Sequence, residues 1–215
     1  MSIEVKINPV EKVPLTLPED DILSRLGRNR HLNKMTGAQN QLITQLMQDG
    51  FALCELRGVW ARLQIKDRGQ DFVQLENGDF FRSAKLEKLL VNSHAVLLFA
   101  ATAGTEIVKV ASHCAANGDG VKALVFDAVG SEAADGAVNW IQLYVDRQLK
   151  RFSEHLTQNR FSPGYGDLGL ENQQIMFNIL HLDRLGVRLS PDFILAPEKT
   201  VTAVAGIEQD IQEQI

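Results

Sequence analysis

The chain has 215 residues, of which 45% are hydrophobic and 23% are charged, and its formal net charge is −5. This composition is typical of a globular protein with a sizeable core, and the acidic balance argues against nucleic acid as the main partner, since phosphate binding needs a basic face. The most apolar run, residues 94–104, is too short to span a bilayer, and the N-terminus has no apolar signal core. We therefore expect a cytoplasmic protein with no membrane attachment.

Hydrophobic periodicity and breaker residues divide the chain into strands and helices. In chain order we expect a strand at 3–10, helices at 17–27 and 36–50, strands at 51–65 and 70–82, a short helix after Ser83, a buried strand at 95–102, helices at 104–118 and 119–156, a helix at 170–186, and two short strands within 187–207. The polar tail after residue 207 is expected to form a terminal helix or a frayed end.

Several of these boundaries depend on single residues. Pro9 is expected to end the first strand, and Gly50 is expected to end the helix that starts at residue 36. Gly130 and Gly136 lie inside the expected long helix, where each costs about 1 kcal/mol relative to alanine. Either another element packs very closely against these two positions, or the helix is weak there.

The order of the elements indicates the fold class. Helices are followed by strands, then by helices, then by strands, which predicts an α+β fold rather than regularly alternating βαβ units. We expect a mixed or mainly antiparallel sheet flanked by helices. We also expect a single domain over residues 1–215, within which residues 1–80 could form a subdomain of helices and strands.

One loop, within "NRFSPGYGDLGLENQ" (159–173), combines residue types that suit ligand binding. Pro163 fixes its own φ angle, and Gly164 can bring bare backbone close to a ligand. Arg160 offers a planar fork for a carboxylate, while Tyr165 offers a ring face and a hydroxyl. The same residues also suit an ordinary turn, and the pattern alone leaves both interpretations open.

Other candidate sites are weaker. Two cysteines are present without a CxxC motif, and the histidines share no ligand spacing, so we expect no metal site. No Ser-His-Asp set, P-loop or GxGxxG motif is visible, and we expect no catalytic side chain of these kinds.

A family resemblance favours the binding interpretation of the loop. "RFSPGYGDLGLENQ", followed by "LGVRLSPDFILAPEKTVTAVAGI", resembles the activation domain of vitamin B12-dependent methionine synthase, and is most similar to free-standing small proteins of that family. "VLLFAATAGTEIVKVAS" (96–112) and "FDAVGSEAADGAVN" (126–139) resemble the middle of those proteins, and "ILSRLG" (22–27) resembles a helix near their start.

The resemblance implies a ligand and the residues that bind it. The family's domain binds S-adenosylmethionine through its Arg-x-x-Pro-Gly-Tyr loop. By position, Arg160 would clamp the methionine carboxylate, and Tyr165 would line the methyl-donor end. Ser162 and Gly164, on either side of Pro163, would offer backbone groups to the adenosine and methionine parts.

The family's long middle helix also contributes a glutamate to the ligand. Glu132 is the nearest match in this sequence, and Asp127 is the alternative. An acid at this place would lie near a positive ammonium or sulfonium group, which it would attract.

The resemblance also implies partners. The family's domain presents the methyl donor to a cobalamin whose cobalt has reached the inactive Co(II) state, and a flavodoxin-type donor supplies an electron. The sequence has no cobalamin-binding Asp-x-His-x-x-Gly motif, so the cobalamin must be carried by a cobalamin-dependent methionine synthase or another corrinoid protein.

We therefore expect an S-adenosylmethionine-binding reactivation protein, an accessory subunit of a methyltransferase in methionine biosynthesis. The alternative is a non-catalytic docking module for a corrinoid protein with a degenerate loop, and a third interpretation is an S-adenosylmethionine sensor. A docking surface should expose apolar and small residues around 163–169. A purely structural loop should bury Tyr165 and pair Arg160 with an internal acid.

Overall fold

The computed structural model describes residues 5–27 and 36–210. The strands are β1 (Ile7–Val10), β2 (Arg57–Arg68), β3 (Phe72–Leu75), β4 (Phe80–Arg82), β5 (Ala95–Thr102), β6 (Glu154–Leu156), β7 (Arg188–Leu189), β8 (Leu195–Ala196) and β9 (Thr200–Gln209). The α-helices are α1 (Glu19–Arg25), α2 (Gly37–Ala52), α3 (Ala84–Leu89), α4 (Glu106–Ala116), α5 (Gly120–Leu149) and α6 (Gln173–Leu180), and the 3₁₀ turns are η1 (Lys150–Phe152), η2 (Leu170–Asn172) and η3 (Leu182–Leu185). The predictions for residues 3–4 and for the tail beyond residue 210 lie outside the described residues.

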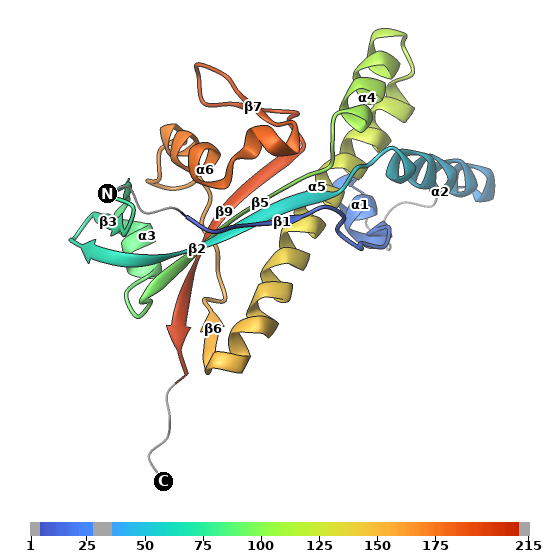
Figure 1. Cartoon of the computed structure of the whole chain (residues 1–215). Coiled ribbons are helices and arrows are strands. Elements are labelled where there is room, and N and C mark those ends of the chain that lie inside the picture. The colour runs from blue at the N-terminus through green and yellow to red at the C-terminus, as the bar shows by residue number, and fades with distance from the viewer. Residues whose placement is uncertain (1–4, 28–35, 211–215) are drawn as a thin grey trace.

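One large sheet organises the chain (Figure 1). Its strands run in the order β4-β3-β2-β5-β9-β6, and β1 pairs with the first half of β2. Every pairing is antiparallel, and β7 and β8 form a separate two-stranded sheet. The predicted α+β class, with a mainly antiparallel sheet flanked by helices, is confirmed.

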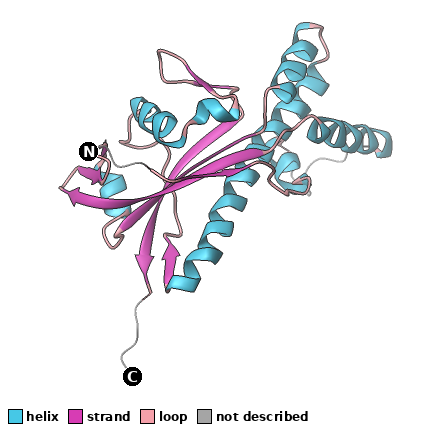
Figure 2. Ribbon diagram, viewed as in Figure 1, coloured by secondary structure: helices cyan, strands magenta, loops and turns pink. Residues whose placement is uncertain are grey.

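The sheet separates two hydrophobic clusters, and β5 contributes to both. Successive side chains of a strand point to opposite faces. Residues 95, 97, 99 and 101 of β5 accordingly belong to the cluster covered by α1, α2, α4 and α5, whereas residues 96, 98 and 100 belong to the cluster covered by α3, α6 and η3. Figure 2 shows the helices on both sides of the sheet. Burial on both faces explains why β5 is a continuous apolar run.

The 30-residue helix α5 is the longest element and extends over about 45 Å. A Cβ added at Gly136 would lie 2.8 Å from Leu15 Cδ2, and one added at Gly130 would lie 3.3 Å from Ile107 Cγ1 on α4. The two glycines therefore mark places where neighbours pack closely, and the helix continues through both.

The predicted boundary at Gly50, between the second helix and the strand that follows it, is wrong. Helix α2 continues past Gly50 to Ala52, and β2 begins only at Arg57. Gly50 is buried where α2 meets α5, and an added Cβ would lie 3.1 Å from Phe126 Cδ1. Its small size therefore serves packing between helices rather than a helix stop. The first strand also continues through Pro9 to Val10.

The C-terminal third differs most from the prediction. The predicted helix at 119–156 ends at Leu149, and Ser153 (φ 55°) turns the chain into β6, which pairs with the end of β9. The helix predicted at 170–186 is interrupted by His181 (φ 49°). Three strands rather than two follow: β7 and β8 pair with each other, and β9 pairs with β5 from Thr200 to Ile207. Local patterns could not reveal strands that form only by pairing with distant ones.

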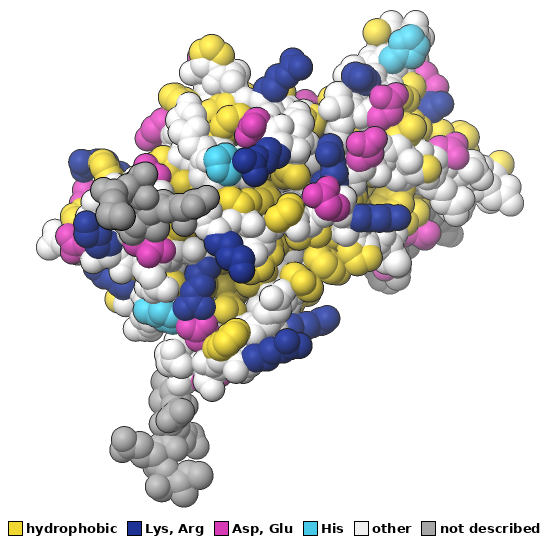
Figure 3. Space-filling model, in the orientation of Figure 1, with side chains coloured by type: hydrophobic (Ala, Val, Ile, Leu, Met, Phe, Trp, Pro, Cys, Tyr) yellow, Lys and Arg dark blue, Asp and Glu magenta, His cyan; other side chains and the backbone are white. Residues whose placement is uncertain are grey.

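The surface and the helices give further information about possible partners. Figure 3 shows acidic and basic side chains interspersed over the visible face. No helix within residues 5–27 and 36–210 is both long and apolar enough to cross a bilayer.

The division of the chain into one domain, with residues 1–80 as a possible subdomain, stays a prediction.

A buried ion pair attaches β6 to the sheet. Arg62 of β2 donates from both terminal nitrogens to the carboxylate of Glu154, at 2.7 and 2.8 Å, and Glu154 is only 6% exposed. His94 Nε2, just before β5, lies 3.0 Å from Glu154 Oε1. The hydrogen bonds from Arg62 hold the pKa of Glu154 below its ordinary value, against the opposing effect of burial.

This pair predicts a pH-dependent contribution to stability. Because the folded-state pKa of Glu154 is depressed, its contribution is present above the ordinary pKa of 4.5 and is lost as the pH falls through the folded-state pKa. Glu154→Gln should lower the free energy of unfolding by about 2 kcal/mol at neutral pH. Denaturant titrations should show this difference shrinking below pH 4.5. A difference that is constant from neutral to acidic pH would contradict the assignment.

The close contact of α5 with the sheet predicts that Gly58 cannot be replaced by a larger residue without loss of stability. An added Cβ at Gly58 of β2 would lie 2.3 Å from Ile141 Cδ1 and 2.7 Å from the carbonyl oxygen of Ala100. Gly58→Ala should therefore destabilise the protein by about 3 kcal/mol, through overpacking against backbone that cannot move away. Gly120→Ala is the control, because nothing lies within 4 Å of its added Cβ. Equal melting temperatures for the two variants would refute this packing account.

Candidate functional site

The loop that carries Arg160 starts from a fixed point on β9. Phe161 and Val204 exchange two backbone hydrogen bonds of 2.8 Å, in which the N–H of each donates to the carbonyl of the other. This isolated bridge lies beyond the last pair of β6 and β9, so the chain runs along β9 until Phe161 and then leaves it. The position of Arg160 next to β9 is therefore set by backbone pairing.

The next residues form a compact turn that leaves Tyr165 outside. Gly164 has φ +90°, and its N–H donates to the carbonyl of Leu168 at 2.8 Å. The N–H of Leu168 in turn donates to the carbonyl of Tyr165 at 3.1 Å. Pro163 and Leu168 are buried, whereas Tyr165 is 71% exposed. The glycine is needed here because the backbone adopts a left-handed conformation.

Asp167 fastens the far side of the turn to α3. Its carboxylate accepts hydrogen bonds from the hydroxyl of Ser83 and, at 3.1 Å, from the backbone N–H of Lys85. The Ser83 oxygen also caps the helix by accepting from the N–H of Leu86. The hydrogen bond from Ser83 lowers the pKa of Asp167. The cap at Ser83 could be read from the sequence, but its second role as an anchor of the loop could not.

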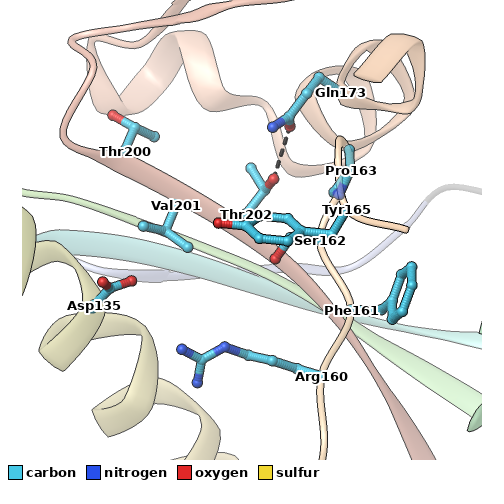
Figure 4. Close-up of a pocket in the computed structure, with 10 residues that line it drawn as sticks. All are labelled: Asp135, Arg160, Phe161, Ser162, Pro163, Tyr165, Gln173, Thr200, Val201 and Thr202. Atoms are coloured by element: carbon cyan, nitrogen blue, oxygen red, sulfur yellow. Dashed lines mark hydrogen bonds between the residues drawn. The ribbon is translucent and has the colours of Figure 1, made fainter. Parts of the chain in front are cut away.

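A cavity of about 440 Å³ lies between this loop, α5, β9 and the start of α6 (Figure 4). Its volume is within the range typical of small-molecule sites. The lining residues are Asp135, Arg160, Phe161, Ser162, Pro163, Tyr165, Gln173, Thr200, Val201 and Thr202. Four of the predicted ligand residues, Arg160, Ser162, Pro163 and Tyr165, are therefore brought to one cavity, while Gly164 shapes the loop without lining it.

Arg160 is the positive group of the cavity. Its Nη1 donates to the side-chain oxygens of Asn139 and, at 3.1 Å, of Gln142, both on α5. Within the described residues no carboxylate forms a hydrogen bond or an ion pair with it. Burial lowers the pKa of Arg160, and the nearby charge of Asp135 partly opposes this shift. The guanidinium is thus held by neutral groups.

Asp135 is the negative group of the cavity and extends from α5 (Figure 4). Burial raises the pKa of this carboxyl, and the charge of Glu132 raises it further, whereas Arg160 and Arg25 act in the opposite direction. Arg25 Nη2 of α1 lies 3.6 Å from Asp135 Oδ2. A carboxyl with a raised pKa would be favoured in its charged form by a bound cation.

The two acids predicted for the ligand have other partners. Glu132 accepts a hydrogen bond from Nε of Arg25, and it does not line the cavity. Asp127 lies five residues before Glu132 on α5, where the Nζ of Lys199 donates to it at 2.6 Å. The ligand role of Glu132 stays a prediction. The acid of α5 that lines the cavity is Asp135. It lies on the same helix face as Asn139 and Gln142, at spacings of i, i+4 and i+7.

Hydroxyl and amide groups form the wall made by β9 and α6. Thr202 is 2% exposed and donates to Oε1 of Gln173 at 2.8 Å. Thr200 donates to the hydroxyl of Thr102 at 2.9 Å. Sequence reasoning missed these residues, although Thr200 and Thr202 alternate with apolar residues in a predicted strand. Among residues 5–27 and 36–210, no cluster of three or more His, Cys, Asp or Glu side chains could hold a metal ion.

Comparison with solved structures finds a similar fold. The crystal structure of the MetH reactivation domain bound to AdoHcy (S-adenosylhomocysteine) aligns with a TM-score of 0.65 and 14% sequence identity, over 100% of this chain and 82% of that chain. Neither a protein-family model nor a curated protein sequence matches the chain. At this identity the likeness establishes the fold, which is that of the reactivation domain.

Proposed function

We propose that this protein binds S-adenosylmethionine in the cavity between α5 and the Arg160 loop, and that it supports the reactivation of a cobalamin-dependent methionine synthase. One observation carries the proposal: a positive group, Arg160, and a negative group, Asp135, line the same cavity without an ion pair between them among the described residues. Such a cavity suits a ligand that has both charges.

The cavity residues fit the chemistry of S-adenosylmethionine. Its methionine part has a carboxylate, which suits the guanidinium of Arg160, and an ammonium and a sulfonium, which suit the carboxylate of Asp135. Its ribose has hydroxyls that suit the polar wall at Thr202 and the backbone near Ser162. Tyr165 lies at the exposed side of the loop, where it would line the methyl-donor end.

The fold supports the same ligand class. The similar solved structure is described as a reactivation domain bound to AdoHcy, which is the demethylated form of S-adenosylmethionine. The loop sequence that resembles the methionine synthase activation domain is also the loop that lines the cavity. The fold, the loop sequence and the chemistry of the cavity thus support the same ligand.

In this proposal the bound S-adenosylmethionine would supply a methyl group to a cobalamin on a partner protein that has gained one electron, and S-adenosylhomocysteine would remain in the cavity. The residues of this chain bind and orient the donor rather than act as acids, bases or nucleophiles. The partner would be a cobalamin-dependent methionine synthase or another corrinoid protein, with a flavodoxin-type electron donor. The protein would then be a cytoplasmic accessory subunit of a methyltransferase.

A docking module without a ligand is the second candidate. It is favoured by the exposed rim of the loop, where Gly164, Tyr165 and Gly166 are all accessible to a partner. A purely structural loop fits less well. That interpretation requires a buried Tyr165 and an Arg160 paired with an acid, whereas Tyr165 is 71% exposed and Arg160 is bound by amides.

Calorimetric titration of S-adenosylmethionine into the protein and into Arg160→Ala tests the ligand directly. We expect saturable binding by the wild type and a loss of affinity of roughly 100-fold in the variant, since it removes hydrogen bonds to a charged group. Arg147→Ala, which removes an exposed arginine of α5 outside the cavity, should bind as the wild type does. Absence of wild-type binding, even with a cob(II)alamin-loaded synthase present, would leave the docking module as the better interpretation.

A second titration tests the role of Asp135. Asp135→Asn should weaken binding of S-adenosylmethionine roughly tenfold, and that of the uncharged thioether S-adenosylhomocysteine less, because only the first ligand has a sulfonium. Wild-type affinity for S-adenosylmethionine should also fall as the pH drops through the raised pKa of Asp135. Asp183→Asn, an exposed position outside the cavity, is the charge-matched control. An equal loss for both ligands would contradict a contact between Asp135 and the sulfonium.

A further inference from the structure

The way in which Arg160 is held has a consequence for the ligand that it can bind. A guanidinium has five N–H donors, two of which are on Nη1. Nη1 of Arg160 contacts both Asn139 and Gln142, and no partner within the described residues contacts its Nε or Nη2. Three donors, including those of the Nε–Nη2 edge, therefore have no partner among the described residues.

The Nε–Nη2 edge has the geometry that binds a carboxylate in two places. Two parallel N–H···O bonds between a guanidinium and a carboxylate are stronger and more directional than a single contact. Because Asn139 and Gln142 occupy Nη1, they fix the rotation of the guanidinium plane about the end of the side chain. The edge is thus oriented before a ligand arrives, which reduces the entropy lost on binding.

For the binding of an anionic ligand by Arg160, the neutrality of the two amide side chains matters as much as their positions. A carboxylate at either position would also hold Nη1, but it would cancel much of the charge that attracts an anionic ligand. Asn and Asp are nearly equal in shape, as are Gln and Glu, so sterics alone do not require amides here. Burial lowers the pKa of Arg160, and the charge of Asp135 opposes this shift only in part.

The arrangement along α5 separates the two charges of the cavity. Asp135, Asn139 and Gln142 lie on one face of the helix, and only the first is charged. The acid therefore lies towards the N-terminal end of this face, and the neutral holders of Arg160 lie one and two turns further on. An acid at position 139 or 142 would place a negative charge beside Arg160 and remove this separation.

We propose that Asn139 and Gln142 are positioning residues that make the Arg160 site selective for a ligand carboxylate, because they orient the guanidinium with neutral groups. This inference rests on the proposed function, since it concerns the same cavity and ligand. Neither residue touches the ligand in this scheme, and both act through Arg160.

The test compares two probes that differ only in the carboxylate. S-adenosylhomocysteine has it, whereas S-adenosyl-3-thiopropylamine keeps the adenosine, thioether and amine and lacks it. Both are titrated calorimetrically into the wild type and into Asn139→Asp, Gln142→Glu and Gln148→Glu. The last variant adds the same charge to α5 outside the cavity and is the matched control.

We expect Asn139→Asp and Gln142→Glu to weaken binding of S-adenosylhomocysteine about tenfold and to leave binding of the amine probe unchanged or slightly stronger. Gln148→Glu should change neither. Asn139→Ala should weaken binding of S-adenosylhomocysteine about threefold, because it loosens the guanidinium without adding a charge. Melting temperatures of all variants confirm that the comparison is made between folded proteins.

The possible failures are distinguishable. If the wild type binds neither probe, even with the cob(II)alamin-loaded synthase present, the proposed function fails and this inference fails with it. If the wild type binds S-adenosylhomocysteine and Asn139→Asp binds it equally well, the inference alone is overturned. Equal losses for both probes would show that the amides only maintain the shape of the cavity, which also overturns it.

Discussion

The candidate site depends on one constraint, which is that β9 is paired along both edges for only part of its length. One edge of β9 is paired with β5 from Thr200 to Ile207. On the other edge, β6 pairs only with residues 207–209, and the bridge to Phe161 follows at Val204. Among the described residues no strand continues this edge at Thr200–Thr202, and the cavity lies there.

This open edge adds polar backbone groups to a cavity whose side-chain lining is both polar and apolar. Alternate residues of an antiparallel strand direct their backbone groups to the same edge, and those of Val204 point to Phe161. The backbone of Thr202 therefore faces the cavity side. An unpaired strand edge presents N–H and C=O groups that need partners, and a small polar ligand can supply them. On β9 the hydroxyl of Thr200 donates to Thr102 of β5, and the hydroxyl of Thr202 donates to Gln173 of α6, so they keep the wall fixed.

Sequence patterns revealed the parts of the site that have local signatures. Arg160, Pro163 and Tyr165 lie in a short stretch with two glycines, and this stretch does line the cavity. The acid of the cavity was harder to predict from the sequence, because "GSEAADG" contains Glu132 and Asp135 only three residues apart. The packing of α1 decides which of the two carboxylates forms the shorter contact with Arg25. The residue types of a loop can be recognised in the sequence. Which face of a long helix points into a cavity depends on how neighbouring elements pack against that helix, and the sequence does not show this.

The same distinction applies to the fold. The buried strand β5 was predictable, because burial on both faces leaves a continuous apolar run in the sequence. The short strand β6 was not, because its three residues are held by pairing with β9 and by the contact of Glu154 with Arg62, far away in the chain. The prediction that Gly50 ends a helix was wrong, because the sequence alone does not distinguish a glycine that ends a helix from one that lets two helices pack closely.

The loop combines a fixed base with an accessible tip, and the proposed function requires this combination. Its base is fixed on one side by the Phe161–Val204 bridge and on the other by Asp167 at the start of α3. Its tip, with Tyr165 between two glycines of positive φ, projects into solvent beside the cavity. A ligand held by Arg160 and Asp135 would be oriented from inside, whereas its reactive end would remain open to another molecule. A protein that carries out its chemistry alone gains from closing such a site, because exclusion of water strengthens electrostatic stabilisation. A protein that passes a group to a cofactor on a partner needs this side to stay open until the partner covers it.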